Sequence, residues 1–405
     1  MKSIYIVATE VPSLRGGAPV RNLNLIIQYV SAGYDVSVFC LFRPKDNDEL
    51  ERLKYIKTLK VYPVPLQSFS VISKVKAILI NRVPPFMSQY RDSNLSKKLT
   101  EICKLSLPDY VQVEQLNAYY AIIPALDGLH GKSIIILDAH NVEQKALRDG
   151  IKMFNPIKKL IGYYILPRFS KLENNASLSV DAVLCCSYDD ATFFRNIGCS
   201  QVIEVPNGVD CSYYRIETHP LTDTLLFMGG TTYPPNEDAL KWYFANIHDL
   251  VKQKRPQLKF FIIGSKPPKW LLKLALNDKS IVLPGYVDDV RKYIKLSSVC
   301  ISPMRGGSGT SLKILEYMAS SKAVVTTTFG VRGIKYTDGY DIMIADDAIK
   351  FANSIVMLMN SKELNIRVSK QARDLMLSSY EWSVIFTNLN QQLELLTLKN
   401  NHENI

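Results

Sequence analysis

The chain has 405 residues, of which 47% are hydrophobic, and it carries a formal net charge of +11. This length exceeds what one hydrophobic core usually supports, so two domains of about 200 residues are expected. No uninterrupted apolar stretch reaches the roughly 18 residues of a membrane-spanning helix, and the apolar run Ile4–Ala8 is too short for a signal-peptide core. The composition therefore excludes an integral membrane protein and predicts one that is soluble or lies on a membrane surface.

The seven cysteines show no CxxC spacing, which argues against a zinc site or a disulfide framework. Four of them fall in apolar, strand-like runs and are expected to be small core residues (Cys40, Cys185, Cys186 and Cys300). The cysteines therefore predict a reduced, cytoplasmic protein. A peripheral position at the inner face of the cell membrane is a further hypothesis that rests on the basic segments described next.

Much of the positive charge is local. Residues 52–104 hold eleven Lys or Arg against two acids, and residues 152–171 hold five more Lys or Arg interleaved with aromatic and aliphatic side chains. Basic segments with apolar residues between the charges suit an anionic membrane surface better than nucleic acid. A plain solvated basic surface is the open alternative.

The first half of the chain alternates apolar runs with helical or basic segments. Ser3–Ala8 is predicted to be a buried strand, Glu10–Gly17 the loop beyond it, and a helix begins at Ala18 and stops before Gly33. This order begins a doubly wound parallel sheet. Further strands are expected at 35–41, 59–62, 109–113, 133–137, 181–186 and 201–205.

A second α/β series follows residues 205–210, where VPNGVD carries a proline and an Asn-Gly turn signal that mark a domain boundary. Its strands are expected at 224–228, 258–263, 280–283, 298–301, 323–326 and 341–344, and its helices at 236–251, 288–296, 312–321 and 347–359. A last helix, over about 381–398, has an apolar stripe that must be covered (Trp382, Ile385, Phe386, Leu389, Leu393 and Leu396).

The same architecture therefore occurs twice. The predicted fold is α/β, with two Rossmann-like, doubly wound parallel-sheet domains facing across a cleft. Ligands of such sheets bind at the carboxyl ends of the strands, so the loops there are the candidate site.

Residues 302–320, SPMRGGSGTSLKILEYMAS, combine a strand end, a glycine loop and a helix. Backbone N–H groups of such a loop and of the helix N-terminus can bind a phosphate. Lys313 and Glu316 are three residues apart and share one helix face. The open alternative is an ordinary N-cap, at Thr310 or Ser311, followed by a surface ion pair.

Four segments together resemble the retaining glycosyltransferases of family 4, which have the GT-B fold. They are RGGAPVRNLNL at 15–25, VPNGVD at 205–210, LLFMGG with PPNEDAL at 225–240, and GYVDDVRKYI followed by the glycine loop. The resemblance implies an acceptor-binding domain over residues 1–205, completed by a crossing helix at about 381–399. It implies a sugar-nucleotide-binding domain over residues 206–380.

The resemblance also implies roles for individual residues. Glu316 matches the carboxylate that binds the ribose hydroxyls, and His140 looks like the histidine beside the reacting sugar. The remaining positions expected to bind the donor are Gly16, Gly17, Gly230, Tyr286, Val287, Gly309, Thr310 and Ser311. Arg21 and Asn141 are expected to bind the acceptor.

The chain departs from the family pattern at three places. Ser308 stands where many members carry a glutamate, and Gly230 and Pro235 stand where many carry an Arg and a Lys. A departing diphosphate needs a positive charge beside it, so Arg305 and Lys313 are expected to take that part. No metal-ligand set is evident, and neither a metal nor another cofactor is expected.

The reaction implied is retaining transfer from a sugar nucleotide to a glycan or lipid-linked glycan, in cell-surface polysaccharide synthesis. Two alternatives remain open: a non-catalytic GT-B subunit that only binds the nucleotide sugar, and a sugar-nucleotide 2-epimerase, which would need clustered acids that the loops do not show. A nicotinamide dehydrogenase is disfavoured because Gly16-Gly17 is not part of a GxGxxG motif.

Overall fold

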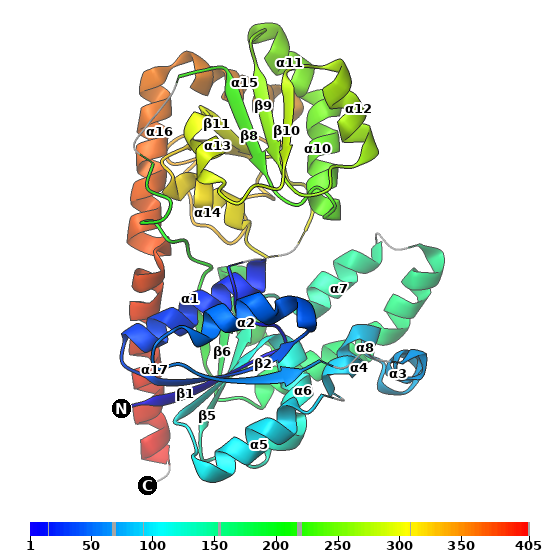
Figure 1. The fold of residues 1–405 in the computed structure, drawn as a ribbon, viewed down its shortest axis with the longest axis vertical. Helices are drawn as coiled ribbons and strands as arrows, with labels where there is room; N and C mark the ends of the chain where they lie inside the picture. Colours follow the sequence, from blue (N-terminus) through cyan, green and yellow to red (C-terminus); the bar gives the residue numbers. More distant parts are fainter. Residues whose placement is uncertain are drawn as a thin grey trace. The chain divides into compact units, whose positions relative to one another are not determined.

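The computed structural model describes residues 1–14, 16–66, 70–91, 93–152, 155–216, 221–307 and 309–403. The chain divides into two compact units (Figure 1). Unit 1 comprises Met1–Pro206 together with the chain from Phe386 onward, and unit 2 comprises Asn207–Ile385.

Unit 1 is built on a seven-stranded, all-parallel sheet with the order β3-β2-β1-β4-β5-β6-β7. Its strands are β1 Ser3–Ala8, β2 Asp35–Phe42, β3 Lys60–Pro65, β4 Tyr110–Glu114, β5 Ile134–Ala139, β6 Ala182–Cys185 and β7 Val202–Glu204. The order reverses between β1 and β4, which is the switch point of a doubly wound sheet.

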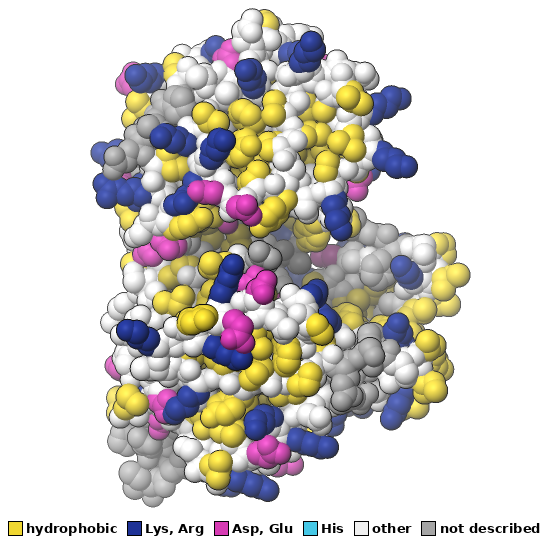
Figure 2. All heavy atoms as spheres, viewed as in Figure 1, with side chains coloured by type: hydrophobic (Ala, Val, Ile, Leu, Met, Phe, Trp, Pro, Cys, Tyr) yellow, Lys and Arg dark blue, Asp and Glu magenta, His cyan; other side chains and the backbone are white. Residues whose placement is uncertain are grey.

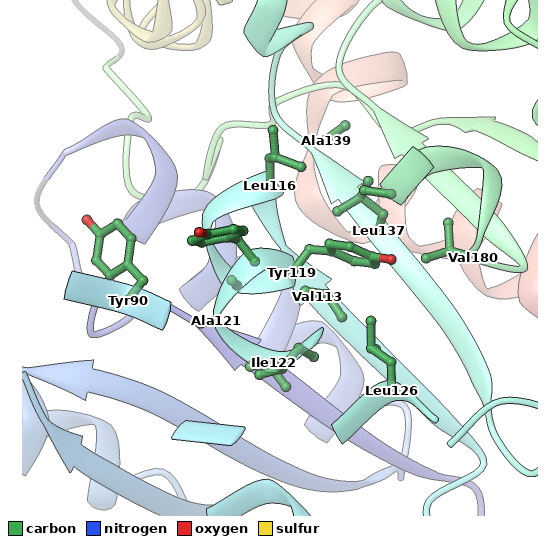
Figure 3. Packing of buried hydrophobic residues seen from close by; sticks show 14 of the residues in the cluster. Tyr90, Val113, Leu116, Tyr119, Ala121, Ile122, Leu126, Leu137, Ala139 and Val180 are labelled. Carbon is green, nitrogen blue, oxygen red and sulfur yellow. The ribbon is translucent and has the colours of Figure 1, made fainter. Parts of the chain in front are cut away.

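The helices of unit 1 connect these strands. They are α1 Gly17–Ser31, α2 Asn47–Lys54, α3 Val71–Lys76, α4 Ser88–Arg91, α5 Leu95–Leu105, α6 Gln115–Leu126, α7 Glu143–Lys152, α8 Pro156–Leu178 and α9 Tyr188–Asn196. A short π-helical turn, Ala77–Asn81, continues α3. The core lies between the helices and the sheet: Figure 3 shows Tyr119 and Ile122 of α6 packed over Val113 of β4 and Leu137 of β5.

Unit 2 repeats the arrangement with six parallel strands in the order β10-β9-β8-β11-β12-β13. The strands are β8 Thr224–Met228, β9 Lys259–Ile263, β10 Ile281–Gly285, β11 Val299–Ser302, β12 Ala323–Thr326 and β13 Met343–Ile344. The helices are α10 Pro234–Asn246, α11 His248–Lys254, α12 Lys269–Asn277, α13 Arg291–Leu296, α14 Leu312–Ala319, α15 Ala348–Asn360 and α16 Lys362–Leu375.

The last helix, α17 Trp382–Glu403, begins in unit 2 and from Phe386 belongs to unit 1. Its predicted apolar stripe is buried throughout, from Trp382 to Leu396. In unit 1 the Phe386 ring meets the Tyr29 ring edge-on at 4.9 Å, and the Tyr34 hydroxyl donates to Asn390 Oδ1 at 2.6 Å. These contacts tie α17 to α1 and to the turn that follows α1.

The doubly wound, two-domain α/β prediction is confirmed, and each predicted strand corresponds to an observed one within a few residues. One predicted helix is two: the chain leaves helical geometry at Ile247 (φ −119°), where Ile247 and His248 both turn into the core. The helix predicted at 288–296 begins only at Arg291. The Asp289 carboxylate accepts a hydrogen bond from the Arg291 N–H and so fixes the turn before the helix. Helices α12 and α16 were not predicted.

The prediction that four of the cysteines are core residues is confirmed, since Cys40, Cys185, Cys186 and Cys300 are all buried. Within the described part of the chain, none of the helices combines the length and the apolar character needed to span a bilayer.

Candidate active site

In unit 2 the glycine loop joins β11 to α14. Gly307 (φ +123°) and Gly309 (φ +73°) take left-handed conformations that residues with a side chain rarely adopt. The guanidinium of Arg332, which lies in the segment after β12, donates to the Gly307 carbonyl at 3.1 Å and holds the loop. Ser308, where the family glutamate would stand, lies outside the described residues.

Helix α14 begins without a side-chain cap. Ser311 occupies the N-cap position, yet its hydroxyl accepts no bond from the first turn, and that turn contains no acidic residue. The N–H groups there are therefore free of the competitor that an ordinary cap would supply. An ordinary Ser311 cap is therefore not observed, and the first turn of α14 has the features that suit an anion.

Lys313, in the first turn of α14, is held at the end of β8. Its ammonium donates to Asn236 Oδ1 at 2.7 Å and lies 4.2 Å above the Phe227 ring. Burial lowers the pKa of Lys313 to about 7, against a partial opposing effect of Glu316. Gly229 has a φ of +149°, which residues with a side chain rarely adopt, and a Cβ there would lie 2.7 Å from Asn236 Nδ2 and 3.0 Å from this ammonium, so glycine suits this position.

Glu316 follows one turn later on the same helix. Burial raises the pKa of its carboxyl to about 7, and a hydrogen bond from the Tyr214 hydroxyl partly opposes the rise. Burial also raises the pKa of Tyr214, with the Glu316 charge adding to it. Glu316 as a whole residue is only partly buried, and its carboxyl can accept more hydrogen bonds than the one from Tyr214, so it retains acceptor capacity for a ligand.

Arg305 does not stand free. Its Nη2 and Nε donate to the two carboxylate oxygens of Asp238, at 2.8 and 3.2 Å, and its guanidinium lies 5.5 Å over the Trp242 ring. Both partners of this pair are exposed, so solvent weakens it and an anionic ligand could compete for the guanidinium.

The other expected donor positions lie on nearby loops of unit 2. Gly230 follows β8 and has open space around it, and Thr310 precedes the uncapped turn. Tyr286 and Val287 follow β10; the Tyr286 side chain is 63% exposed, while Val287 packs against the core. These positions all follow the carboxyl ends of parallel strands.

In unit 1 a polar cluster lies where β4 and β5 end. Both ring nitrogens of His140 form a hydrogen bond. Nε2 lies 3.0 Å from Glu114 Oε2, and Nδ1 lies 3.1 Å from Gln115 Nε2. His140, Glu114 and the neighbouring Asp138 are all buried. The ring is therefore held rigidly, and the loop from His140 to Asn141 presents mainly backbone and the partly exposed Asn141.

Arg21, from α1, also belongs to this cluster. Its Nε and Nη2 donate to the two oxygens of Asp138 at 3.0 and 2.9 Å, and its Nη1 donates to the Val205 carbonyl at 2.9 Å. Only 1% of Arg21 is exposed. The expectation that Arg21 binds the acceptor directly does not fit this burial, because the guanidinium would have to leave Asp138. Arg21 instead anchors the end of β5.

Glu114, Asp138 and His140 each offer one ligand atom within 4.8 Å of the others, close enough to share a metal ion. The Arg21 guanidinium already neutralises Asp138 and occupies both of its oxygens. A second cation beside it would meet strong repulsion in a buried site. Burial and the Asp138 charge also raise the pKa of Glu114, so the cluster holds less negative charge than its three ligand atoms suggest, which disfavours a metal site.

Two more carboxyls lie beside this cluster. Glu173 accepts the backbone N–H groups of Glu143 and Gln144 at 2.6 and 2.9 Å and so caps α7. Burial and the nearby Glu173 raise the pKa of Glu143 to about 7. Both line a cavity of about 10 Å³ with His140, room for about one water molecule. These acids lie on β4, β5, α7 and α8, whereas the sequence prediction of few clustered acids concerned the loops.

At the N-terminus of α1, Gly16 is the N-cap residue and Gly17 the first helical residue; this helix also lacks a side-chain cap and an acid in its first turn. Gly17 has open space around its Cα. Both glycine loops thus precede helices whose first turns carry no negative charge.

Two family models match the chain. One, described as Glycosyltransferase Family 4, matches residues 15–213, and the other, Glycosyl transferases group 1, matches residues 222–361. Together they cover most of both units. The chain belongs to glycosyltransferase family 4.

Relatives and solved structures agree with this assignment. The glycosyltransferase is 22% identical over 401 residues to an uncharacterized 44.6 kDa protein in the cps region of Klebsiella pneumoniae, covering 96% of this chain and 99% of that one. Its fold matches HepE of Anabaena, solved in complex with UDP (TM-score 0.69, 13% identity, 97% and 100% of the two chains). It also matches sucrose-phosphate synthase of Thermosynechococcus elongatus (TM-score 0.70, 14% identity, 98% and 100%). The GT-B fold is thereby established.

For this glycosyltransferase, sequence reasoning found the loop, Lys313 and Glu316, but missed their partners. Asn236 and Asp238 lie in PPNEDAL, a motif already noted, and Tyr214 lies four residues after the VPNGVD turn. Their presence in family-like segments was the available signal. The contacts that these partners make with Lys313, Arg305 and Glu316 could not be predicted from the sequence, because they join residues far apart in the chain.

Proposed function

We propose that this glycosyltransferase transfers a sugar from a nucleotide-diphosphate donor to a hydroxyl of a glycan or lipid-linked glycan, with retention at the anomeric carbon. The observation that carries the proposal is the uncapped first turn of α14, which follows the glycine loop and bears Lys313 and, one turn on, Glu316. The diphosphate of a donor needs an anion site, and its ribose hydroxyls need a hydrogen-bond acceptor such as a carboxylate. The first turn of α14 and Glu316, one turn later, are candidates for these two parts.

Each part of the donor has a candidate partner in unit 2. The diphosphate would accept from the N–H groups of Gly309 to Ser311 and from the Lys313 ammonium. Glu316 would accept from the ribose hydroxyls, and the loop with Tyr286 and Val287 would lie along the base. Gly230, and Gly16 with Gly17 in unit 1, would allow close backbone approach.

In the reaction, the bond between the anomeric carbon and the diphosphate breaks and the acceptor oxygen bonds to that carbon. The proton of the acceptor hydroxyl passes to the departing phosphate oxygen on the same face of the sugar. Lys313 would stabilise the charge of the leaving group, and Arg305 could join it by exchanging Asp238 for phosphate. We propose that this occurs without a metal ion, because these cations supply the charge that a metal would otherwise bring.

Unit 1 would bind the acceptor, with His140 and Asn141 on the loop after β5. Its buried network fixes this loop, which favours positioning over proton transfer by the His140 ring. The HepE complex with UDP supports a nucleotide-sugar donor, and the relative in a cps region supports a cytoplasmic step of cell-surface polysaccharide synthesis.

The test is a panel of UDP-, GDP- and dTDP-sugars, read first by thermal stabilisation, since a ligand that binds the folded state raises the melting temperature. Donors that stabilise the chain are then incubated with glycan acceptors, and the anomeric configuration of the product is determined by NMR. Stabilisation with neither transfer nor hydrolysis would identify a binding subunit and contradict the proposal.

The acids gathered near His140 give the 2-epimerase a specific observation in its favour. Incubation of each stabilising donor without acceptor separates the two reactions. An epimerase releases the sugar nucleotide with inverted C2, or free sugar and nucleotide; the transferase leaves the C2 configuration unchanged.

A further inference from the structure

Two segments of unit 1 that are far apart in sequence lie side by side. The Arg82 guanidinium lies 4.7 Å over the Tyr164 ring and its Nε donates to the Tyr164 hydroxyl at 3.0 Å. That hydroxyl in turn donates to the Leu79 carbonyl at 3.2 Å. We call the two segments, residues 70–91 and 155–171, the basic apolar surface.

This surface exposes large aliphatic and aromatic side chains at helical spacing. Val71, Val75 and Leu79 follow each other every four residues, and Ile157, Leu160 and Tyr164 share one face of α8. Exposed fractions run from 39% for Tyr164 to 79% for Ile72. The full set is Val71, Ile72, Val75, Leu79, Ile80, Phe86, Ile157, Leu160, Tyr163 and Tyr164. Apolar groups clustered in this way mark an interaction site.

Every charge on the surface is positive. Neither segment contains an acidic residue, and each contributes four cations: Lys74, Lys76, Arg82 and Arg91 in the first, and Lys158, Lys159, Arg168 and Lys171 in the second. Figure 2 shows dark-blue side chains bordering yellow ones at the right-hand edge of unit 1, where Figure 1 labels α3 and α8.

A pocket of about 570 Å³ opens between the two segments. Lys76, Arg91 and Arg168 line it together with Ser73 and Ser88. Arg91 is steadied by its bond to the Tyr120 carbonyl at 3.3 Å. Among the described residues, none of the carboxylates forms an ion pair with Lys76, Arg91 or Arg168, so no described acid competes with an anionic ligand for these three cations.

We propose that the basic apolar surface docks unit 1 on an anionic lipid bilayer, with a lipid phosphate held by the cationic pocket. Branched aliphatic side chains suit acyl chains, and a surface with only positive charge is complementary to anionic headgroups. Nucleic acid fits less well, because its recognition uses planar stacking platforms rather than exposed isoleucine and leucine. This inference goes beyond the proposed reaction, since docking requires neither donor nor acceptor.

The first test is flotation of the full chain with phosphatidylcholine vesicles, with and without phosphatidylglycerol. Binding is expected only to the anionic vesicles, and it should weaken with added salt. A variant with Ile72→Ser, Ile80→Ser, Ile157→Ser and Leu160→Ser should lose affinity by about tenfold or more. The matched control makes the same change at four exposed positions elsewhere: Leu105, Leu107, Leu276 and Ile349.

No flotation of the unaltered chain at low salt would overturn the proposal, as would an equal loss in the control variant. Donor-induced thermal stabilisation is measured on the same samples. It should be unchanged in both variants, so a failure of docking is distinguishable from a failure of the proposed transferase function.

The second test addresses the pocket. Lys76→Gln with Arg168→Gln is compared with Lys158→Gln with Lys159→Gln, which removes the same charge from the same surface outside the pocket lining. If the pocket holds a headgroup phosphate, the first pair should weaken binding to anionic vesicles about tenfold more than the second. Equal losses would overturn the assignment of the pocket.

Discussion

The ammonium of Lys313 donates a 2.7 Å hydrogen bond to Asn236 Oδ1, which joins the first turn of α14 to the start of α10. Asn236 also donates to the Gly230 carbonyl at 3.1 Å. One amide thus links the lysine of the glycine-loop helix to the loop after β8. This makes Asn236 a positioning residue for Lys313.

Asn236→Ala should lower kcat about tenfold or more with little change in KM, because the ammonium loses the partner that aims it. Asn236→Asp should instead shift the high-pH limb of the rate profile upward, since a carboxylate favours the charged form of Lys313. Asn246→Ala, on the same helix, is the control. A kcat of Asn236→Ala equal to that of the control would contradict the role.

Glu316→Ala should weaken donor binding about 100-fold, because two charge-assisted hydrogen bonds to the ribose would be lost. The measurement is calorimetric titration with the donor that stabilises the chain most. Glu363→Ala, exposed on α16, serves as control. Unchanged donor affinity in Glu316→Ala would refute the ribose role.

Because the pKa of Lys313 is lowered, donor binding is expected to depend on pH. Its pKa in the free protein is about 7, so above that pH much of it is neutral. The diphosphate favours the ammonium and raises this pKa on binding. Donor affinity should therefore fall as pH rises from about 7 to about 9, and binding at pH 8 should take up a proton.

Lys313→Arg should abolish that pH dependence, because a guanidinium stays charged throughout the range. Lys313→Ala should lower donor affinity at pH 7 to the level that the unaltered chain shows near pH 9, and it should lower turnover by a larger factor because the charge on the diphosphate grows as it departs. Calorimetry in buffers of different ionisation enthalpy measures the proton uptake. Identical uptake in the unaltered chain and in Lys313→Arg would assign the titration to another group.

Arg21→Met should destabilise the protein by about 3–5 kcal/mol, because it leaves the buried Asp138 carboxylate without its partner. Urea unfolding measures the change. The comparison is Arg195→Met, whose partner Glu204 forms an exposed pair worth less than about 1 kcal/mol. An Arg21→Met protein as stable as Arg195→Met would contradict the anchoring role and reopen direct contact with the acceptor.

Most of the fold was readable from the sequence. Buried parallel strands such as Ser3–Ala8 and Thr224–Met228 appear as short apolar runs because both faces of the sheet are covered. Helix ends were less readable: α10 and α11 look like one helix, and only the packing of Ile247 and His248 divides them. The glycine loop with Lys313 and Glu316 was readable because its parts are neighbours in the chain.

The sequence by itself determined the two α/β repeats, the family, the loop before α14 and the concentration of positive charge in two segments. Only the tertiary structure decided which polar groups are inside and what holds them. Arg21 reads as an ordinary residue of an amphipathic helix, and its partner Asp138 lies 117 residues away. Lys313 and Asn236 are 77 residues apart. Local patterns specify strands and helices because those depend on neighbours, whereas pairing of charges and pKa shifts depend on burial, which is a property of the whole fold.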